Sequence, residues 1–382
     1  MKKNVLRFGS YVMVSALSVA MTLGILFWQT GGLSKLDQLE TLIRHYYVEE
    51  VDPTVLEDAA ADAMIAATGD RWSYYIPAKE YASYVEASEN AYVGIGVTIT
   101  KADDGSGLRI MEVNPGSSAQ EAGIQVDDVI IAIERQDAAG MTTGEARNLV
   151  RGKAGTRVHM TIWRAGETFD LSVTRRRIKV AVASGQLLEG NVGLVSISNF
   201  DDRCAEETIA AIEELMDQGA QSILFDVRNN PGGYTRELVK LLDYLLPEGD
   251  LLRTVDYAGR EDVDRSDVRH LEIPMAVLVN SNSYSSAEFF AAALQEYEAA
   301  VVIGEKTSGK GRLQNTFRLI DGSAVALSIA KYYTPKGISL EGVGIIPDVE
   351  VTVSEDEFIE IYYGQLTPQE DPQIRAALEA LK

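Results

Sequence analysis

The chain has 382 residues and a formal net charge of −22, with 57 acidic and 35 basic side chains. This acidic balance argues against a nucleic-acid partner, because proteins that bind the phosphate backbone normally present a basic face to it. The single cysteine, Cys204, excludes an intramolecular disulfide and a thiolate metal cluster. We interpret Cys204 as a structural residue, since no nearby histidine in the sequence would activate its thiol.

Residues 1–32 predict a short cytoplasmic stub followed by a transmembrane signal-anchor. Residues 8–28 form an uncharged, mainly apolar run, and a helix of this length crosses a hydrocarbon core of about 30 Å. Bulky residues in LFWQTGG stand where a signal peptidase would cut, which favours an uncleaved anchor over export with signal cleavage. The basic residues before the run predict a single-pass protein of the cell membrane with its bulk outside the cytoplasm.

Residues 33–90 predict an N-terminal helical segment. Apolar side chains recur at helical spacing from Leu36 to Tyr46. Thr54 and Glu57 match a capping box for a second helix, which we expect to end at Gly69. These helices cannot bury their own apolar faces and must pack on another part of the protein.

Residues 91–177 change to the two-residue period of β-strands and predict a compact β-rich domain. The expected strands are YVGIGVTIT, GLRIMEV, DVIIAI, RVHMTIW and TFDLSVT, with helices at SSAQEAG and TTGEARNLVRG. In the first strand, the backbone of Gly94, Ile95, Gly96 and Val97 could hold a peptide carboxylate while a strand edge pairs with the peptide main chain. A tight turn without ligand is the alternative.

Residues 178–355 alternate apolar strands with amphipathic helices, which predicts a layered α/β core with a mixed sheet. The expected strands are VGLVSIS, SILFDV, MAVLVN, AAVVIG, RLQNTFRL and AVALSIAKYY, and the expected helices are AEETIAAIEELMD, TRELVKLLDYLL and AEFFAAALQEY. Residues 356–382 form a polar, partly helical C-terminal tail.

One segment of this core matches most of a phosphate-binding loop, since Gly304, Gly309 and Lys310 give G-x-x-x-x-G-K. That loop needs a serine or threonine after the lysine to bind magnesium, and a helix whose N-terminal amides hold the phosphates. Here Gly311 follows the lysine, and the next residues, RLQNTFRL, alternate as a strand does. The sequence therefore does not favour a nucleotide-binding enzyme.

A serine-rich turn before the last core helix suggests a nucleophile. Ser285 stands between a buried strand and a helix, where free N–H groups and the helix dipole can stabilise an oxyanion. Ser285 and Glu288 also match a capping box, so a purely structural N-cap is the alternative.

A serine nucleophile needs a base. The three histidines, His45, His159 and His270, do not follow the layout of a Ser-His-Asp triad. A lysine can replace histidine where an apolar pocket keeps its amine neutral. Lys310 ends an apolar strand between two glycines, although a solvated loop lysine would look the same.

The segment from NSNSYSSAEFF to GEKTSGKGRLQ resembles the active-site region of the C-terminal processing peptidases, also called tail-specific proteases. The resemblance implies that Ser285 is the nucleophile, Lys310 the general base and Gln314 the residue that orients the base. The 25 residues from Ser285 to Lys310 agree with the family's spacing. Because the turn reads SYSSAE, Ser283 and Ser286 remain alternative nucleophiles.

The resemblance extends over almost the whole chain after the predicted anchor. ILFDVRNNPGGY looks like the family's D-x-R-x-N-P-G-G loop, which implies an oxyanion hole formed by the amides of Gly232 or Gly233 and of Ser286. GIGVTIT, VNPGSSAQEAGIQVDDVIIAI and LVRGKAGTRVHMTIWR look like the PDZ domain that the family inserts before its catalytic core. Arg151 in this domain is a candidate link between peptide binding and activity.

Together these features imply an α/β (α+β) multidomain protein, with a mixed-sheet peptidase core, an inserted PDZ domain and an N-terminal helical segment. The expected activity is that of a serine endopeptidase, which cleaves proteins or peptides near a free C-terminus that the PDZ domain binds. No metal or other cofactor is expected. A catalytically inactive PDZ scaffold is the alternative, and homo-oligomerisation is left open.

Overall fold

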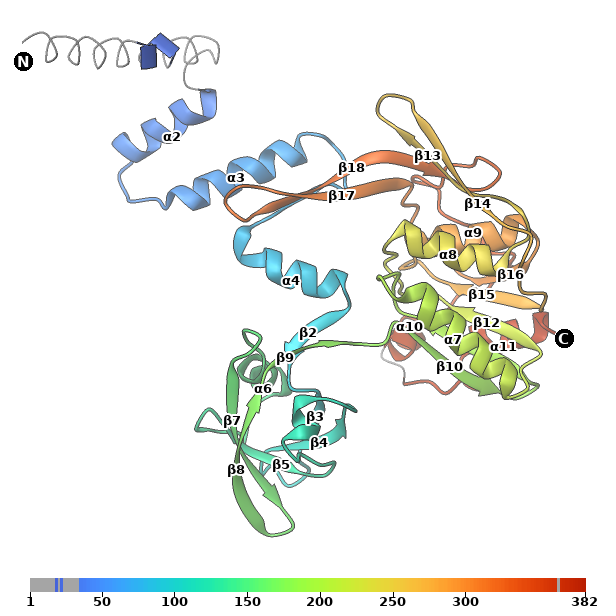
Figure 1. Cartoon of the computed structure of the whole chain (residues 1–382), viewed down its shortest axis with the longest axis horizontal. Helices are drawn as coiled ribbons and strands as arrows, with labels where there is room; N and C mark the ends of the chain where they lie inside the picture. The colour runs from blue at the N-terminus through green and yellow to red at the C-terminus, as the bar shows by residue number, and fades with distance from the viewer. Residues whose placement is uncertain (1–17, 20, 23–33, 363–364) are drawn as a thin grey trace, which may run out of the picture. The chain divides into compact units, whose positions relative to one another are not determined.

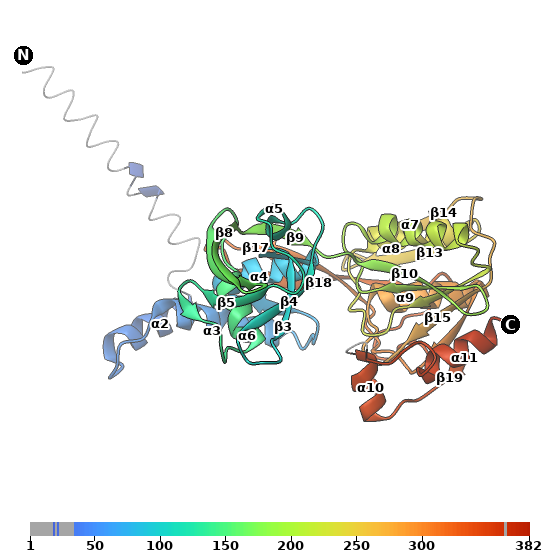
Figure 2. The ribbon, with the colours of Figure 1, turned by 90° about the horizontal axis from the view of Figure 1, so that it is seen from below.

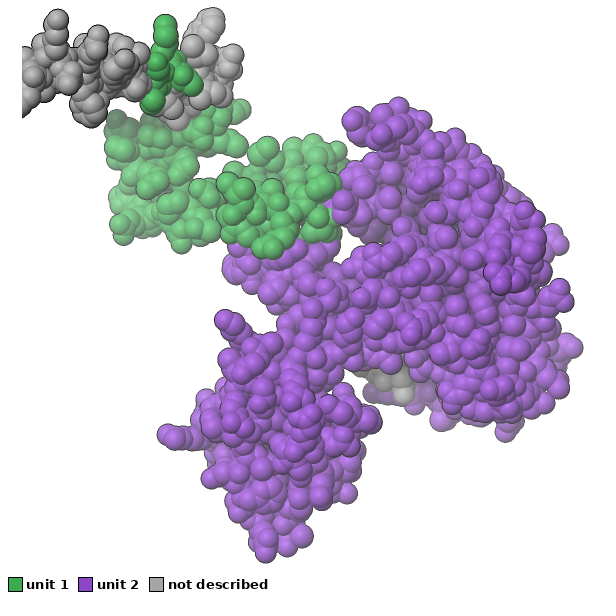
Figure 3. All heavy atoms as spheres, in the orientation of Figure 1, with its two compact units in different colours: residues 1–77, 316–327 green, residues 78–315, 328–382 purple. Residues whose placement is uncertain are grey.

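The computed structural model describes residues 18–19, 21–22, 34–362 and 365–382. The predicted anchor at residues 8–28 lies almost entirely outside this part of the chain, and none of the helices described is long and apolar enough to span a membrane. The chain divides into two compact units (Figure 3). Unit 1 contains residues up to 77 with 316–327, and unit 2 contains residues 78–315 with 328–382.

Unit 1 contains two helices and a short strand from the N-terminal region. They are α2 (Lys35–Tyr46), α3 (Pro53–Ala66) and β1 (Tyr74–Ile76), and β1 pairs antiparallel with the first residues of β18 (Ala324–Tyr333). The Tyr75 hydroxyl donates a hydrogen bond to Asp58 Oδ1 at 2.7 Å, which ties β1 to α3. The structure confirms both helices that the sequence predicts here.

The ends of α3 differ from the prediction. The N-cap is Asp52, whose side chain accepts a hydrogen bond from the N–H of Thr54 at 2.9 Å, so the predicted capping box at Thr54 is wrong. Pro53 suits the first helical position because its missing N–H would have no partner there, and the helix therefore begins before Thr54. It ends at Ala66 and not at Gly69.

The β-rich segment of unit 2 follows α4 (Ala78–Ser88) and contains two sheets. A two-stranded sheet pairs β2 (Ala91–Gly94) with β9 (Arg176–Lys179). The larger sheet has the order β3-β4-β5-β7-β8, with β6 added beside β5. The strands of this sheet are β3 (Val97–Lys101), β4 (Leu108–Val113), β5 (Val129–Ile133), β6 (Gln136–Asp137), β7 (Arg157–Arg164) and β8 (Glu167–Thr174), and the helices α5 (Ser118–Glu121) and α6 (Thr143–Val150) connect some of them.

The first strand predicted in this segment is divided in the structure. Ile95 and Gly96 separate β2 from β3, because Gly96 adopts a φ of 85° that a strand does not allow, and Ile95 turns into the apolar core. β3 is the terminal strand in the order of the larger sheet. It therefore has an edge to which an extended peptide can add.

The core of unit 2 is a six-stranded sheet of order β10-β11-β12-β15-β16-β19 (Figure 1). β10 is antiparallel to β11 and the remaining pairs are parallel. The strands are β10 (Ala183–Leu188), β11 (Val192–Ile197), β12 (Ser222–Asp226), β15 (Met275–Val279), β16 (Ala300–Gly304) and β19 (Val349–Glu350). The mixed α/β core predicted from the sequence is thus confirmed.

Helices cover both faces of this sheet (Figure 2). α7 (Cys204–Asp217), α8 (Thr235–Leu245) and α9 (Ser286–Glu296) share one apolar cluster with Val195, Phe225 and Val277 of the strands. α11 (Pro372–Ala380) packs on the opposite face, against Leu224 and Ala276. Successive side chains of a strand point to opposite faces of the sheet, so helices on both sides bury both faces of the central strands.

The C-terminal tail is more firmly attached than its polar composition predicts. It contains α10 (Glu355–Tyr362) and α11, and α11 buries Ile374 and Ala377 in the core. Arg228, which follows β12, donates to Asp371 Oδ2 at 2.7 Å and to Gln373 Oε1 at 2.9 Å, and both acceptor residues are buried. A buried ion pair therefore links the tail to the loop after β12.

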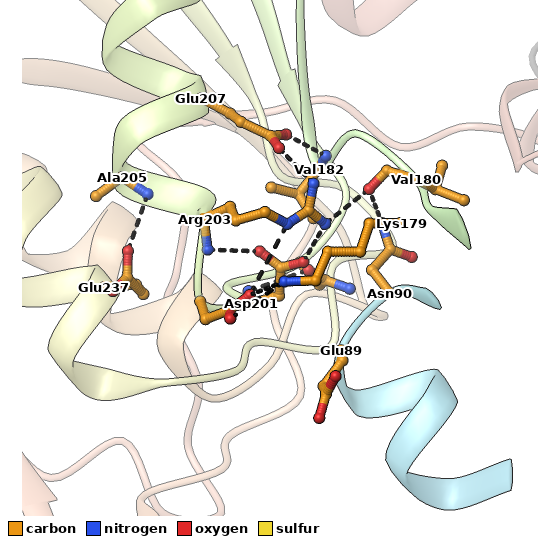
Figure 4. A network of polar contacts seen from close by, with 12 residues as sticks. Glu89, Asn90, Lys179, Val180, Val182, Asp201, Arg203, Ala205, Glu207 and Glu237 are labelled. Atoms are coloured by element: carbon orange, nitrogen blue, oxygen red, sulfur yellow. Dashed lines mark hydrogen bonds and ion pairs between the residues drawn. The ribbon is translucent and has the colours of Figure 1, made fainter. Parts of the chain in front are cut away.

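Hydrogen bonds also join the two segments that enter and leave the β-rich segment (Figure 4). The N–H of Val180 donates to Asn90 O at 2.9 Å, and Asn90 Nδ2 donates to Val180 O at 3.2 Å. Arg203, just before α7, donates to the same Val180 carbonyl at 2.8 Å and pairs with the buried Asp201. These contacts attach the connecting segments to the start of α7.

Candidate active site

Ser285 lies at the N-cap of α9, directly after β15 and a short turn, as the sequence predicts. Its φ of 59° and ψ of −128° are unusual for a residue with a side chain. Such a conformation costs on the order of 1–3 kcal/mol and persists where neighbouring contacts impose it, commonly at functional sites. The backbone thus presents the Ser285 side chain at the N-terminus of a buried helix.

The three serines of this turn have different surroundings. Ser283 is fully buried, and its hydroxyl donates to Val227 O at 2.7 Å. Ser286 is also buried, and its hydroxyl donates to Gly233 O at 3.0 Å. Ser285 is only partly buried. Accessibility therefore favours Ser285 over the other two serines as a nucleophile.

The loop after β12 packs directly against this serine. Gly232 has a φ of 84°, and a Cβ at this position would lie 2.7 Å from the Ser285 Cβ and 2.8 Å from the Ser286 nitrogen. The Gly232 N–H donates to Asn230 Oδ1 at 2.8 Å, and the buried Asn230 amide donates to Ile197 O at 2.8 Å. Asn230 thus fixes Gly232 beside the start of α9.

Replacing Gly232 by alanine is expected to lower kcat/KM about 100-fold, because the loop that carries both predicted oxyanion donors, Gly232 and Gly233, would be displaced. The added methyl group would push Gly232 away from Ser285 and Ser286. Gly190→Ala is the matched control, because Gly190 has a φ of 80° and a methyl group added there would have no atom within 4 Å. Both variants carry the same backbone strain, so peptide-cleavage kinetics and urea unfolding separate strain from displacement; equal activities would contradict this prediction.

Lys310 lies between β16 and β17 (Arg312–Arg318), so a strand and not a helix follows Gly311, as the sequence predicts. The Lys310 Nζ donates to Gln314 Oε1 at 2.5 Å. It also lies 5.8 Å from the centre of the Tyr284 ring. The structure therefore brings together the predicted base and the predicted orienting residue, beside the residue that precedes Ser285.

The glycines on either side of Lys310 allow another backbone segment to approach closely. A Cβ on Gly309 would lie 2.9 Å from the nitrogens of Val343 and Gly344, and one on Gly311 would lie 2.7 Å from the nitrogen of Glu341. These contacts require glycine at both positions. The backbone of Lys310 is consequently held on a packed loop, and the residue is half-buried.

Glu288 connects the serine turn with the lysine loop. Its Oε2 accepts hydrogen bonds from the N–H groups of Ser285 and Lys310, both at 2.9 Å. Its Oε1 accepts from Thr307 Oγ1 at 2.5 Å and from the Gly309 N–H at 2.7 Å. Burial raises the pKa of this fully buried carboxyl, while the four hydrogen bonds oppose the increase.

The sequence predicted Glu288 only as half of a capping box. The S-x-x-E spacing does place its carboxylate on the Ser285 N–H, as a capping box would. The spacing gave no signal of the bond to Lys310, which comes from the other side of β16. A single carboxylate thus fixes both backbone segments that carry the predicted catalytic pair.

The other predicted residues lie in the β-rich segment or in α7. Gly94 to Val97 form the turn from β2 to β3, and Arg151 at the end of α6 has its guanidinium 5.1 Å from the centre of the Tyr92 ring. Cys204 is buried, and burial raises the pKa of its thiol to about 12. This environment agrees with a structural role for the cysteine, because a reactive thiol needs a lowered pKa.

Comparison with known proteins identifies the family to which the chain belongs. The profile of peptidase family S41 matches residues 191–351, and a PDZ-domain profile matches residues 109–164. The chain is 33% identical to the carboxy-terminal processing protease CtpA of Bacillus subtilis (strain 168) over 357 residues, which cover 90% of this chain and 76% of the relative. It is 32% identical to a carboxyl-terminal-processing protease of Synechocystis sp. (strain PCC 6803), over 84% of this chain and 76% of that protein.

The fold is also found among solved structures. A protein of Bacteroides fragilis NCTC 9343, provisionally assigned to the S41 proteases, superposes with a TM-score of 0.53 at 17% identity, over 90% of this chain and 96% of that one. At this identity the likeness concerns the fold alone. The sequence relatives establish the family: the chain belongs to the carboxy-terminal processing serine proteases of peptidase family S41.

Proposed function

We propose that Ser285 is the nucleophile of this serine endopeptidase and that Lys310 is its general base. The neutral Lys310 amine takes the hydroxyl proton as Ser285 Oγ bonds to the scissile carbonyl carbon, and then gives this proton to the leaving amine. Gln314 accepts the hydrogen bond from Lys310 Nζ and so orients the amine. The observation that carries this proposal is the shared carboxylate of Glu288, which fixes the backbones of Ser285 and Lys310 together.

The oxyanion of the tetrahedral intermediate would be stabilised by two backbone amides. Ser286 is the first residue of α9, and an N–H at this position has no acceptor within the helix. The Gly232 N–H already donates to Asn230, which favours Gly233 over Gly232 as the second donor. The helix dipole of α9 adds to the stabilisation of the negative charge.

We propose that the PDZ domain binds the free C-terminus of the substrate. The peptide would add as a strand to the edge of β3, with its carboxylate near Gly94 to Val97. α6 packs beside β3, and the two elements would form the sides of the peptide site. Arg151 stands at the end of α6, and its guanidinium lies over the Tyr92 ring. In this proposal Arg151 would transmit peptide binding to the peptidase core.

We further propose that the peptidase acts outside the cytoplasm, anchored in the cell membrane by residues 8–28. The support is the length of the apolar run and the basic residues before it. If the anchor is retained, the protein will stay with membranes during alkaline carbonate extraction. Release of the full-length chain into the supernatant would contradict this proposal.

Cleavage of an unfolded substrate, supplied with a free or an amidated C-terminus, tests the proposed activity. We expect the wild type to cleave the free form at least about tenfold faster, because an amide removes the charge that the PDZ turn would bind. Ser285→Ala should cleave neither form. An inactive PDZ scaffold would bind the free C-terminus without cleaving it, and residual full activity in Ser285→Ala would exclude Ser285 as the nucleophile.

A further inference from the structure

A tyrosine from a distant part of the chain contacts the proposed nucleophile. The hydroxyl of Tyr332, on β18, lies 2.8 Å from Ser285 Oγ, within hydrogen-bonding distance. Tyr332 is only 2% exposed, and Phe289 of α9 packs edge-on against its ring with 4.1 Å between the ring centres. The phenol is therefore held in one position beside the serine.

The direction of this hydrogen bond decides what the tyrosine can do. If Ser285 donated to Tyr332, the serine proton would point at the phenol and not at a base. If Tyr332 donates, the serine proton is free for Lys310 and the phenol stabilises negative charge on Oγ. Burial raises the pKa of Tyr332, so the phenol keeps its proton at neutral pH and cannot itself serve as the base.

We propose that Tyr332 is a catalytic hydrogen-bond donor to Ser285 Oγ, an inference that rests on the proposed role of Ser285 as the nucleophile. In acylation, the Oγ–C bond forms while the serine proton passes to Lys310, and the scissile C–N bond then breaks as Lys310 gives this proton to the leaving amine. The Tyr332 proton stays on the phenol. In deacylation, Lys310 takes a proton from water as the water oxygen bonds to the acyl carbon. The Oγ–C bond then breaks, and Tyr332 stabilises the departing oxygen until Lys310 gives it this proton. The phenol gains and loses no proton in this cycle.

The surroundings of the contact support a role beyond packing. The Tyr332 N–H donates to Gly311 O at 3.2 Å, so the backbone of the tyrosine is tied to the residue after Lys310. Together with Glu288, this bond connects the strand that carries the phenol to both segments of the proposed catalytic pair. Tyr332 therefore contacts Ser285 from a strand that is hydrogen-bonded to the residue after the proposed base.

The test compares Tyr332→Phe with Tyr333→Phe, its neighbour on β18. We expect Tyr332→Phe to lower kcat about 10–100-fold, the loss of one hydrogen bond to a developing charge, with little change in KM. The rate at which a fluorophosphonate modifies Ser285 should fall by a similar factor. Tyr333→Phe should match the wild type in both measurements, and thermal unfolding shows whether each variant is folded.

Two results of this kinetic test would overturn the proposal: wild-type kcat and labelling rates in folded Tyr332→Phe, or an equal loss in Tyr333→Phe.

Raman spectra of the wild type and Ser285→Ala give a second test that does not need the Tyr332 variant, since the tyrosine bands report whether the phenol donates a hydrogen bond. Unchanged tyrosine bands in Ser285→Ala would also overturn the proposal. If Ser285→Ala and Lys310→Ala cleave normally, the proposed function itself fails. If those two are inactive while Tyr332→Phe is fully active, only the role of Tyr332 fails.

Discussion

Replacing Lys310 by alanine is expected to lower kcat/KM by at least about a thousandfold, because no other group would take the proton from Ser285. Lys310→Arg should be nearly as inactive, since a guanidinium stays protonated and cannot act as a base. KM should change little if Lys310 does not contact the substrate. Steady-state kinetics on a short peptide that carries a free C-terminus would measure both effects.

Lys306→Ala is the matched control for Lys310. Lys306 is an exposed residue on the same loop, and its removal makes the same change in net charge. We expect this variant to retain wild-type kinetics. Equal losses in the two alanine variants would show that the loop needs positive charge and not a base, and full activity in Lys310→Ala would remove the lysine from the mechanism.

Changing Glu288 to glutamine should lower kcat by about 100-fold and destabilise the fold by roughly 1–3 kcal/mol. A glutamine amide has one acceptor oxygen, and its NH₂ group would face two of the N–H or O–H donors that Glu288 now accepts. Either the Ser285 and Lys310 amides or the Thr307 and Gly309 donors would lose their acceptor. The serine turn and the lysine loop would no longer be fixed together.

The pH dependence of Glu288→Gln gives a second reading. Burial raises the pKa of Glu288 above its ordinary value of 4.5, so protonation begins at a higher pH than in an exposed glutamate. Protonation turns one acceptor oxygen into a donor, so activity should fall more steeply at acid pH than protonation of the proposed base Lys310 alone would cause. This additional acid loss should be absent in Glu288→Gln, which keeps only the limb of Lys310, and present in Glu298→Gln, a substitution at an exposed position after α9. An equally steep acid limb in Glu288→Gln would contradict the assignment.

The elements of the core could be predicted because their side chains follow regular periods. The uninterrupted apolar runs around Val195, Phe225 and Val277 identify strands that are buried on both faces. β13 (Gly249–Asp256) and β14 (Glu261–Ser266) were missed because their hairpin has many charged side chains and little apolar alternation. Cross-strand pairing and contact with β18 stabilise it, and neither is visible in a local pattern.

The proposed pair of Ser285 and Lys310 could be located in the sequence from short motifs and their spacing, but the contacts that support it could not. Ser285 and Lys310 lie in short motifs that identify them in the sequence. Tyr332 lies 47 residues from Ser285, and Asp371 lies 143 residues from Arg228. These pairs meet only because strands β12, β15, β16 and β18 and helix α11 fold against one another. A sequence pattern contains local periods and not the contacts that tertiary folding creates.

The most direct measurement is the site and rate of fluorophosphonate modification, determined by mass spectrometry on the intact protein and its peptides. The account predicts one adduct on Ser285 in the wild type, at least a hundredfold slower modification in Lys310→Ala, and no adduct in Ser285→Ala. An adduct on Ser283 or Ser286, or an unchanged rate in Lys310→Ala, would contradict the proposed serine–lysine mechanism.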